Sequence, residues 1–211
     1  MPGITKRERL ARIQKQKRYT KRKTVGVDWD GTIFDVASAF ELAAFVLFKR
    51  RAKLVKHCVK SIVFDPPLSE VESKRVLYEG LTLPQIQKQV GFLPGAIESI
   101  KRVIAEGDQP IIITRRSSKP LLDCLEQSLA SVGLNIPFYS CGFHGVKRDL
   151  AVAHRCSVFI DDDLEQLWPM VKKVEKLFFI RHWYNRHQWD HKLGIVQDVN
   201  THEAFRFGLY L

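Results

Sequence analysis

Two aspartates, Asp28 and Asp30, stand two positions apart in the segment VGVDWDGTIFD, directly after an apolar run and before a Gly-Thr pair. Carboxylates held this close repel each other, so the arrangement is tolerated where a cation or a reaction uses both. A nucleophile next to a general acid, with a metal ion between their charges, is one such use. This segment is therefore the first candidate for an active site.

Further polar residues follow apolar runs later in the chain. Thr114 ends QPIIIT, Lys147 comes shortly after IPFYSC, and Asp161 and Asp162 end CSVFIDD. Short apolar runs of this kind are typical of strands that are buried on both faces of a parallel sheet. The stretches between them have helical periodicity, and KLFFI supplies a fifth run before an aromatic and His-rich loop.

Capping residues, prolines and glycines set the expected helix ends. Asp35 is placed to cap a first helix, and Asp163 a late one, although Asp163 could also act as an acid beside the site. The expected helices cover residues 36–48, 94–107, 118–133, 146–153 and 164–174. Strands that alternate with helices predict an α/β fold, a Rossmann-like parallel sheet with helices on both faces.

In an open parallel sheet, ligands bind at the carboxyl ends of the strands. This rule brings the polar residues that follow the apolar runs to one edge: Asp28, Asp30, Thr114, Lys147, Asp161 and Asp162. Carboxylates, a hydroxyl and an ammonium at one edge suit a divalent cation together with a phosphoryl group.

In order and spacing, these residues resemble the four motifs of the haloacid dehalogenase-like phosphohydrolase superfamily: DWDGT, IIITRR, Lys147 in HGVKRD, and VFIDDD. The resemblance covers residues 25–34 and 94–180. It implies a magnesium-dependent phosphatase that acts on a small phosphorylated substrate through an aspartyl-phosphate intermediate. It also implies a small helical cap, inserted after the first strand.

The resemblance gives each residue a role. Asp28 would be the nucleophile, and Asp30 would protonate the leaving oxygen and later activate water. Mg²⁺ would be held by Asp28, the Asp30 carbonyl and Asp162, with Asp161 beside it. The phosphate-binding residues would be Gly31, Thr32, Thr114, Arg115 and Lys147. Arg148, next in the chain, competes with Lys147 for the third-motif role.

Two further segments are similar to the 5'(3')-deoxyribonucleotidase-like branch of that superfamily. TRRSSKP matches the Thr-x-Arg-Pro that follows the second strand of the branch, with Arg116 as its Arg but Ser117 in place of Pro. KLFFIRHWYNR runs into a Tyr184-Asn185 pair, and a short strand and an acidic helix are expected to close the chain. The branch implies a nucleoside monophosphate, or a similar compact phosphate ester, as substrate.

The motifs divide the chain into three parts: a basic arm at residues 1–24, a core at 25–35 and 93–211, and the cap at 36–92. Within the cap, six basic residues lie between Lys49 and Lys60. They either coat a solvent-facing helix, which is the more common use of a charge run, or attract anionic substrates to the entrance.

The arm carries most of the excess charge of the chain. The net charge of the chain is +11. Residues 1–24 contain ten Lys or Arg and one acidic residue, Glu8, so the arm contributes +9 and the remainder about +2. Such an arm is expected to be flexible. It suggests an alternative function, a nucleic-acid-associated protein that binds RNA or DNA nonspecifically through the arm, as in a polynucleotide-end phosphatase. It can equally be a solubilising or targeting tail.

Other classes are disfavoured. Four dispersed cysteines indicate reducing, cytoplasmic surroundings rather than a disulfide scaffold or zinc ribbon. The longest apolar stretch, residues 36–48, is too short to cross a membrane. His187 and His191 have helical spacing but no third ligand, so a zinc site is not expected there. Because both Asp28 and Asp30 are present, a catalytically inactive relative is also disfavoured.

Overall fold

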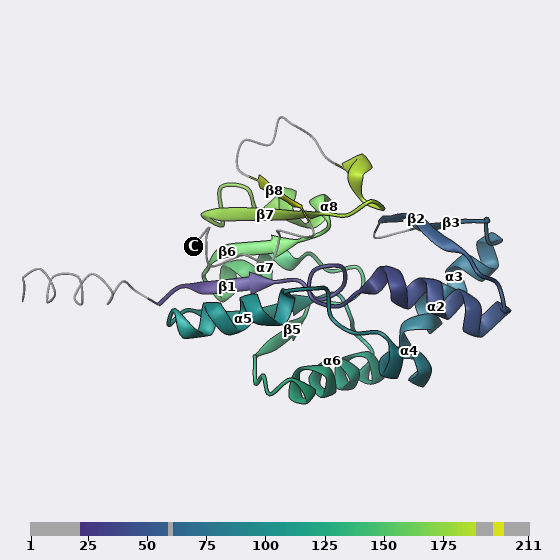
Figure 1. The fold of residues 1–211 in the computed structure, drawn as a ribbon. Helices are drawn as coiled ribbons and strands as arrows, with labels where there is room; N and C mark the ends of the chain where they lie inside the picture. The colour runs from purple at the N-terminus through teal and green to yellow at the C-terminus, as the bar shows by residue number, and fades with distance from the viewer. Residues whose placement is uncertain (1–21, 59–60, 189–195, 201–211) are drawn as a thin grey trace, which may run out of the picture.

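The computed structural model describes residues 22–58, 61–188 and 196–200. Six parallel strands form its main sheet, in the order β5-β4-β1-β6-β7-β8 (Figure 1). Their bounds are β1 Thr24–Val27, β4 Gln109–Thr114, β5 Phe138–Ser140, β6 Cys156–Asp161, β7 Lys176–Arg181 and β8 Val196–Asn200. The predicted parallel sheet is confirmed, and β8 is the short closing strand. The expected acidic helix after it, like the arm at residues 1–21, lies outside the described residues.

Alternate strand residues enter two separate apolar clusters, one on each face of the sheet. In β4, Ile112 packs in a cluster with Ile100 of α5 and Leu125 of α6, while Ile111 and Ile113 enter the other cluster. The second cluster contains residues of α7 and α8. Burial of both faces explains why the strands are continuously apolar.

The helices of the core follow the expected order. Their bounds are α5 Ala96–Ala105, α6 Lys119–Ser131, α7 Lys147–Ala153 and α8 Leu164–Leu167, with a 3₁₀ turn at Trp168–Met170. Helix α5 begins later than Pro94 because Gly95, at φ 80°, is its N-cap. Helix α8 is shorter than the predicted 164–174 because Pro169 has no N–H to continue it.

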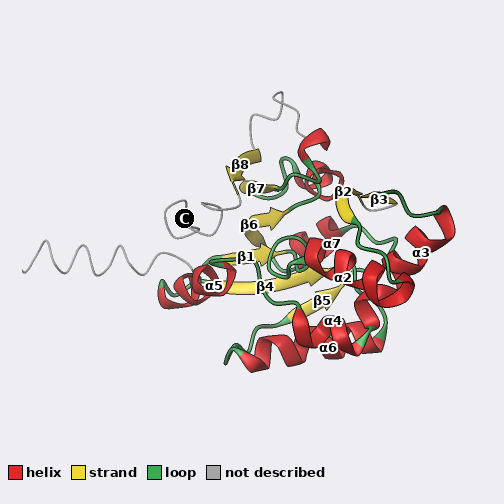
Figure 2. Cartoon of the chain, turned by 45° about the vertical axis from the view of Figure 1, so that its right-hand side comes forward, coloured by secondary structure: helices red, strands yellow, loops and turns green. Residues whose placement is uncertain are grey.

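The segment between β1 and α5 gathers at the end of the sheet toward which β1 and β6 point (Figures 1 and 2). Its helices are α2 Val36–Phe48, α3 Glu70–Glu79 and α4 Pro84–Gln89, with a 3₁₀ turn at Gly80–Thr82. The predicted bounds of α2 are confirmed, as is its cap, because an Asp35 carboxylate oxygen accepts a hydrogen bond from the Ser38 N–H.

The expectation that the basic run at 49–60 coats a helix is wrong. The structure has an antiparallel hairpin instead, β2 Lys53–Cys58 and β3 Ser61–Asp65. In β3 the buried residues Ile62 and Phe64 alternate with exposed ones, as in a strand with one face on the core. The cap therefore combines helices with a hairpin. No helix in the described part of the chain has the length and apolar character needed to cross a membrane.

Candidate active site

The register of the sheet places Asp28 beside Asp161. Val27 of β1 pairs with Ile160 of β6, so the next residue of each strand reaches the same edge. The Asp28 N–H continues the ladder by donating to the Ile160 carbonyl oxygen at 2.9 Å. Both carboxylates are buried, with Asp161 fully enclosed.

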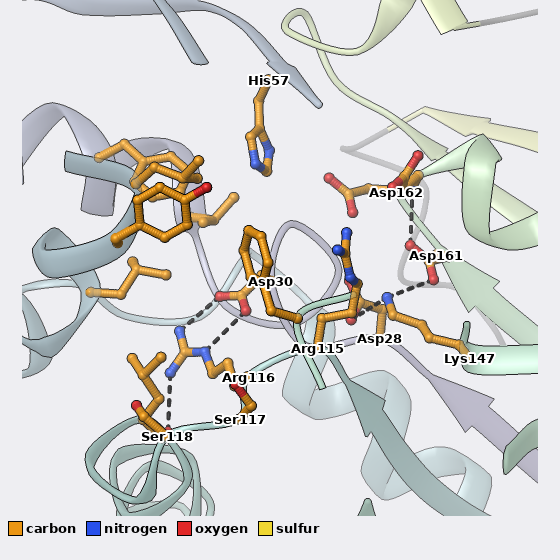
Figure 3. A pocket seen from close by; sticks show the side chains of 18 of the residues that line it. Asp28, Asp30, His57, Arg115, Arg116, Ser117, Ser118, Lys147, Asp161 and Asp162 are labelled. Carbon is orange, nitrogen blue, oxygen red and sulfur yellow. Dashed lines mark hydrogen bonds and ion pairs between the residues drawn. The ribbon is translucent and has the colours of Figure 1, made fainter. Parts of the chain in front are cut away.

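Lys147 joins these two carboxylates from the first residue of α7. Its Nζ lies 2.7 Å from Asp28 Oδ1 and 2.8 Å from Asp161 Oδ2 (Figure 3). Its backbone N–H donates to the Gln166 side-chain oxygen at 3.2 Å, which fixes the start of the helix. Arg148 instead pairs with Asp149 on the surface. Of the two candidates for the third motif, the structure brings Lys147 to the site.

The site holds more negative charge than its lysine balances. Burial raises the pKa of Asp28 to about 7, against the lowering effect of Lys147. Burial also raises the pKa of Asp161 to about 6, and it raises that of Asp162 well above its usual value, with Asp28 adding to the effect. Although burial opposes the charge of Lys147, Asp161 and Asp28 raise its pKa. A further cation would therefore be favoured here.

Three of these carboxylates could hold that cation. Asp28, Asp161 and Asp162 each offer an oxygen, and the three atoms lie within 4.8 Å of one another. Asp161 is already engaged, because Oδ2 contacts Lys147 and Oδ1 accepts from the Asp163 N–H at 3.0 Å. Buried carboxylate oxygens without sulfur or imidazole ligands are the donor set preferred by Mg²⁺ or Ca²⁺. The residues thus fit a divalent cation.

Two residues from the loop after β7 orient Asp162, and the sequence analysis assigned neither to the site. The Tyr184 hydroxyl donates to Asp162 Oδ2 at 3.1 Å. The Asn185 amide donates to the Asp162 carbonyl oxygen at 2.7 Å and to the Ile180 carbonyl oxygen at 2.9 Å. The Tyr184-Asn185 pair, noted from sequence only for its resemblance, was the available signal.

Gly31 occupies a position where another residue would not fit. Its φ is 77°, and an added Cβ would lie 2.1 Å from Asp162 Oδ2 and 2.7 Å from the Tyr184 hydroxyl. Its N–H donates to the Phe34 carbonyl oxygen at 3.0 Å, and its own carbonyl oxygen contacts His182 Nε2. The N–H that we expected to face a phosphate is therefore used within the turn.

Asp30 is held by an arginine from the loop after β4. Arg116 Nε lies 3.0 Å from Asp30 Oδ2, and its Nη2 lies 2.7 Å from Oδ1, so the pair is bidentate (Figure 3). The Arg116 guanidinium also lies 5.1 Å from the Phe34 ring centre. Such pairs fix both distance and orientation. Arg116 matches a family arginine in the sequence, but the match does not predict this contact.

The remaining predicted phosphate-binding residues lie close behind the site. Thr114 is fully buried, and its hydroxyl accepts from the Arg116 N–H at 3.1 Å. Thr32 is also fully buried, and its hydroxyl has no partner among the described residues. Arg115 faces the cavity with its guanidinium 5.0 Å from the Phe143 ring centre. Asp163 caps α8, as expected, by accepting from the Glu165 N–H.

The charged residues of the site lie at the floor of a cavity of about 300 Å³ between the sheet edge and the cap. Asp28, Asp30, Lys147, Asp161 and Asp162 line it, as do Arg115 and Arg116, whereas Gly31, Thr32 and Thr114 do not. The side chain of His187 and all of His191 lie outside the described residues. Among the residues that are described, the acidic cluster is the one group with metal-ligand geometry.

Comparisons with known proteins place this fold. No protein-family model and no curated protein sequence matches the chain. Among solved structures, a haloacid dehalogenase-like hydrolase from Streptococcus pneumoniae aligns with a TM-score of 0.60 at 11% identity, over 91% of this chain and 99% of its own. A predicted phosphatase from Clostridium acetobutylicum gives 0.60 at 13% identity, over 90% and 99%.

A third structure was solved with a ligand. CbbY from Rhodobacter sphaeroides, in complex with xylulose 1,5-bisphosphate, aligns with a TM-score of 0.56 at 14% identity, over 89% of this chain and 96% of its own. The predicted fold is thereby confirmed: the chain has the fold of the haloacid dehalogenase-like hydrolases.

Proposed function

We propose that this protein is a Mg²⁺-dependent phosphomonoester hydrolase with Asp28 as its nucleophile. The observation that carries the proposal is the contact of Lys147 with both Asp28 and Asp161, next to the Asp162 carboxylate. An ammonium group beside a buried carboxylate neutralises charge that would gather on a transferring phosphoryl group. When bound by Asp28, Asp162 and the Asp30 carbonyl, with Asp161 beside them, Mg²⁺ supplies further positive charge for the phosphoryl oxygens.

The chemistry takes two displacements at phosphorus. An Asp28 oxygen attacks the phosphorus, the ester P–O bond breaks, and Asp30 gives its proton to the leaving oxygen. Asp30 then takes a proton from a water molecule, which attacks the phosphorus and releases phosphate and the free Asp28 carboxylate. Because both Asp30 oxygens accept hydrogen bonds from Arg116, one of them must turn from the guanidinium for the proton transfers.

A small ester is the substrate that suits the cavity, and we propose a nucleoside monophosphate or a compound of similar size. A volume of about 300 Å³ is at the lower end for small-molecule sites. Arg115, with its Nε buried and unpartnered among the described residues, is available to the phosphate. Gly31 and Thr114 would support the turns beneath it, through the positive φ of Gly31 and the hydrogen bond that the Thr114 hydroxyl accepts from the Arg116 N–H.

We place this activity in a reducing cytoplasm. The cysteines whose side chains the structure describes are Cys124, Cys141 and Cys156, and all three are free thiols. Burial raises the pKa of each of these thiols, so they are held protonated and little reactive.

The test is release of phosphate from p-nitrophenyl phosphate with and without Mg²⁺. We expect the wild type to require the metal and Asp28→Asn to lose at least about a thousandfold in turnover. Asp123→Asn is a matched control, because Asp123 lies on the exposed face of α6 and pairs with Lys119. Equal activity of Asp28→Asn and wild type would refute the nucleophile assignment.

The acid role of Asp30 has its own test. Asp30→Asn should slow the first step for alkyl phosphates more than for p-nitrophenyl phosphate, because a good leaving group needs no proton. Single-turnover rates on both substrates measure the difference. Equal losses on the two esters would contradict the role.

A further inference from the structure

The cavity has two unlike halves. Its charged lining residues, such as Asp28, Arg115 and Lys147, all belong to the core. The cap half is lined by side chains that carry no fixed charge: Val36, Phe40, His57, Leu77, Tyr78 and Leu81. A second phosphate or a carboxylate on the substrate would therefore find no cation among the described residues on the cap side.

The cations in and just before the hairpin do not add positive charge to the cap half of the cavity. Lys53 and Lys56 are exposed and do not line the cavity. Arg50 is turned toward α3, where its Nη1 lies 3.1 Å from Glu72 Oε2. No described Lys or Arg of the basic run lines the cavity, so the alternative that the run attracts substrate anions at the entrance has no support among the described residues.

Several of the cavity's lining side chains are rings, which lie beside aliphatic residues such as Leu77 and Leu81. Tyr78 of α3 meets Phe143 of the core at 5.3 Å between ring centres, and Phe143 in turn lies against the Arg115 guanidinium. On another side, Phe40 of α2 meets the His57 ring edge to face at 5.2 Å. Rings arranged in this way favour a flat, apolar body over the hydroxyl groups of an open sugar.

His57 and Tyr78 are the two side chains of the cap half that carry a polar group, and His57 is the more enclosed of them. Its ring extends from β2 into the cavity, on the side across from Asp30 (Figure 3). Its backbone N–H donates to the Tyr184 carbonyl oxygen at 3.3 Å, and the ring rests against Phe40 and Tyr184. No described residue hydrogen bonds to its ring nitrogens. Burial lowers the pKa of His57 to about 4, so at neutral pH one nitrogen donates and the other accepts.

We propose that the cap half binds an uncharged planar ring on the leaving group of the substrate, and that His57 selects rings with a hydrogen-bonding edge. This inference rests on the proposed function and narrows it. The substrate would carry a single phosphoryl group and a heteroaromatic ring, in contrast to the bisphosphate sugar in the CbbY complex. A site built to hydrogen bond a polar edge discriminates strongly against ligands that lack one.

Three esters separate the parts of this proposal: uridine 5'-monophosphate, ribose 5-phosphate, which lacks the ring, and phenyl phosphate, whose ring has no polar edge. We expect His57→Phe to lower kcat/KM for the uridine ester about tenfold while phenyl phosphate changes less than about twofold. His57→Gln should recover most of the loss, because an amide also donates and accepts. Lys56→Gln, one residue away and exposed, should match the wild type on every ester.

Binding to Asp28→Asn, measured by calorimetry, keeps this test independent of turnover. We expect the uridine ester to bind at least about tenfold more tightly than ribose 5-phosphate, and His57→Phe in this background to remove most of the difference. Equal affinity for the two esters, or equal losses on all three in His57→Phe, would overturn the proposal. Hydrolysis without ring preference would overturn it and leave the proposed function intact, whereas His57-dependent binding without hydrolysis would do the reverse.

Discussion

At the edge of the sheet, carboxylates and cations from distant strands contact each other directly. Lys147 Nζ lies within 2.8 Å of a carboxylate oxygen of Asp28 and of one of Asp161, and Arg116 holds Asp30 through two hydrogen bonds. The cap half of the same cavity is held by apolar packing, and the ring nitrogens of His57 have no hydrogen-bond partner there among the described residues. The groups that we propose to act on phosphorus are thus fixed by contacts within the protein, while the ring nitrogens of His57, proposed to face the leaving group, are left available.

This difference indicates how one fold can keep a reaction and change its substrate. The charged residues come from strand ends, where the register allows little variation. The cap residues come from α2, β2, α3 and the 3₁₀ turn at Gly80–Thr82, none of which belongs to the main sheet that carries Asp28. Substitutions at the edge should therefore affect stability, metal binding and turnover, and those in the cap half should affect substrate ranking.

The largest effect is expected from Lys147→Met, which keeps length and removes the charge. Because it leaves Asp28 and Asp161 buried without their partner, it should cost about 3–5 kcal/mol in the free energy of unfolding without metal. Urea denaturation measures this. Lys119→Met, which breaks an exposed pair with Asp123, should change the free energy of unfolding far less, because solvent screens an exposed ion pair. Similar costs for both would mean that the buried ion pairs contribute little.

A second effect concerns pH. The pKa values of Asp28 and Asp161 are raised to about 7 and about 6, so the folded state binds more protons than the unfolded state between about pH 4 and pH 7. Their contribution to stability is therefore lost as pH rises through this window. His57 and His182, whose pKa values desolvation lowers to about 4, act in the opposite sense.

Comparing the wild type with Asp28→Asn isolates the contribution of Asp28 to this pH dependence. In EDTA, the variant should gain on the order of a few kcal/mol relative to wild type between pH 4 and pH 7. Mg²⁺ should cancel much of this gain by stabilising the ionised wild-type cluster. Thermal unfolding across the pH range, with each additive, measures both. A difference between the two proteins that does not vary with pH would contradict the burial of an ionisable Asp28.

A smaller effect is expected from Tyr184→Phe, which removes the hydroxyl that donates to Asp162 and keeps the ring against His57. Residues that orient metal ligands commonly contribute tenfold or more to affinity. Calorimetric titration should therefore show Mg²⁺ binding weakened about tenfold. Tyr139 lies in the edge strand β5, on the side of β4 away from β1. Tyr139→Phe should therefore bind Mg²⁺ like the wild type. Unchanged affinity in Tyr184→Phe would remove Tyr184 from the metal site.

The strand-end residues could be predicted because a parallel sheet brings its carboxyl ends to one edge. That rule alone places Asp28, Asp161 and Asp162 together, and the structure agrees. The contacts that orient them could not be predicted in the same way. Arg116 and Asp30 are 86 residues apart in sequence, and no local pattern indicates that they form a bidentate pair.

The cap was harder to predict for a different reason. Lysines in the run at 49–60 mask the strand alternation of β2, and as a result nothing in the sequence singles out His57. The clean alternation of Ile62 and Phe64 in β3 was a usable signal for the hairpin. The end of α8 could also have been predicted, because Pro169 interrupts the expected helix.

The most direct test of the central claim is to identify the residue that carries the phosphoryl group. Asp30→Asn should slow breakdown of the intermediate, so this variant is mixed with Mg²⁺ and p-nitrophenyl phosphate, denatured during turnover and reduced with borohydride. Borohydride converts an acyl phosphate to an alcohol, so peptide mass spectrometry should find homoserine in place of Asp28, and only when substrate is present. Turnover accompanied by an unreduced Asp28, or by reduction at another carboxylate, would contradict the assignment of Asp28 as the nucleophile.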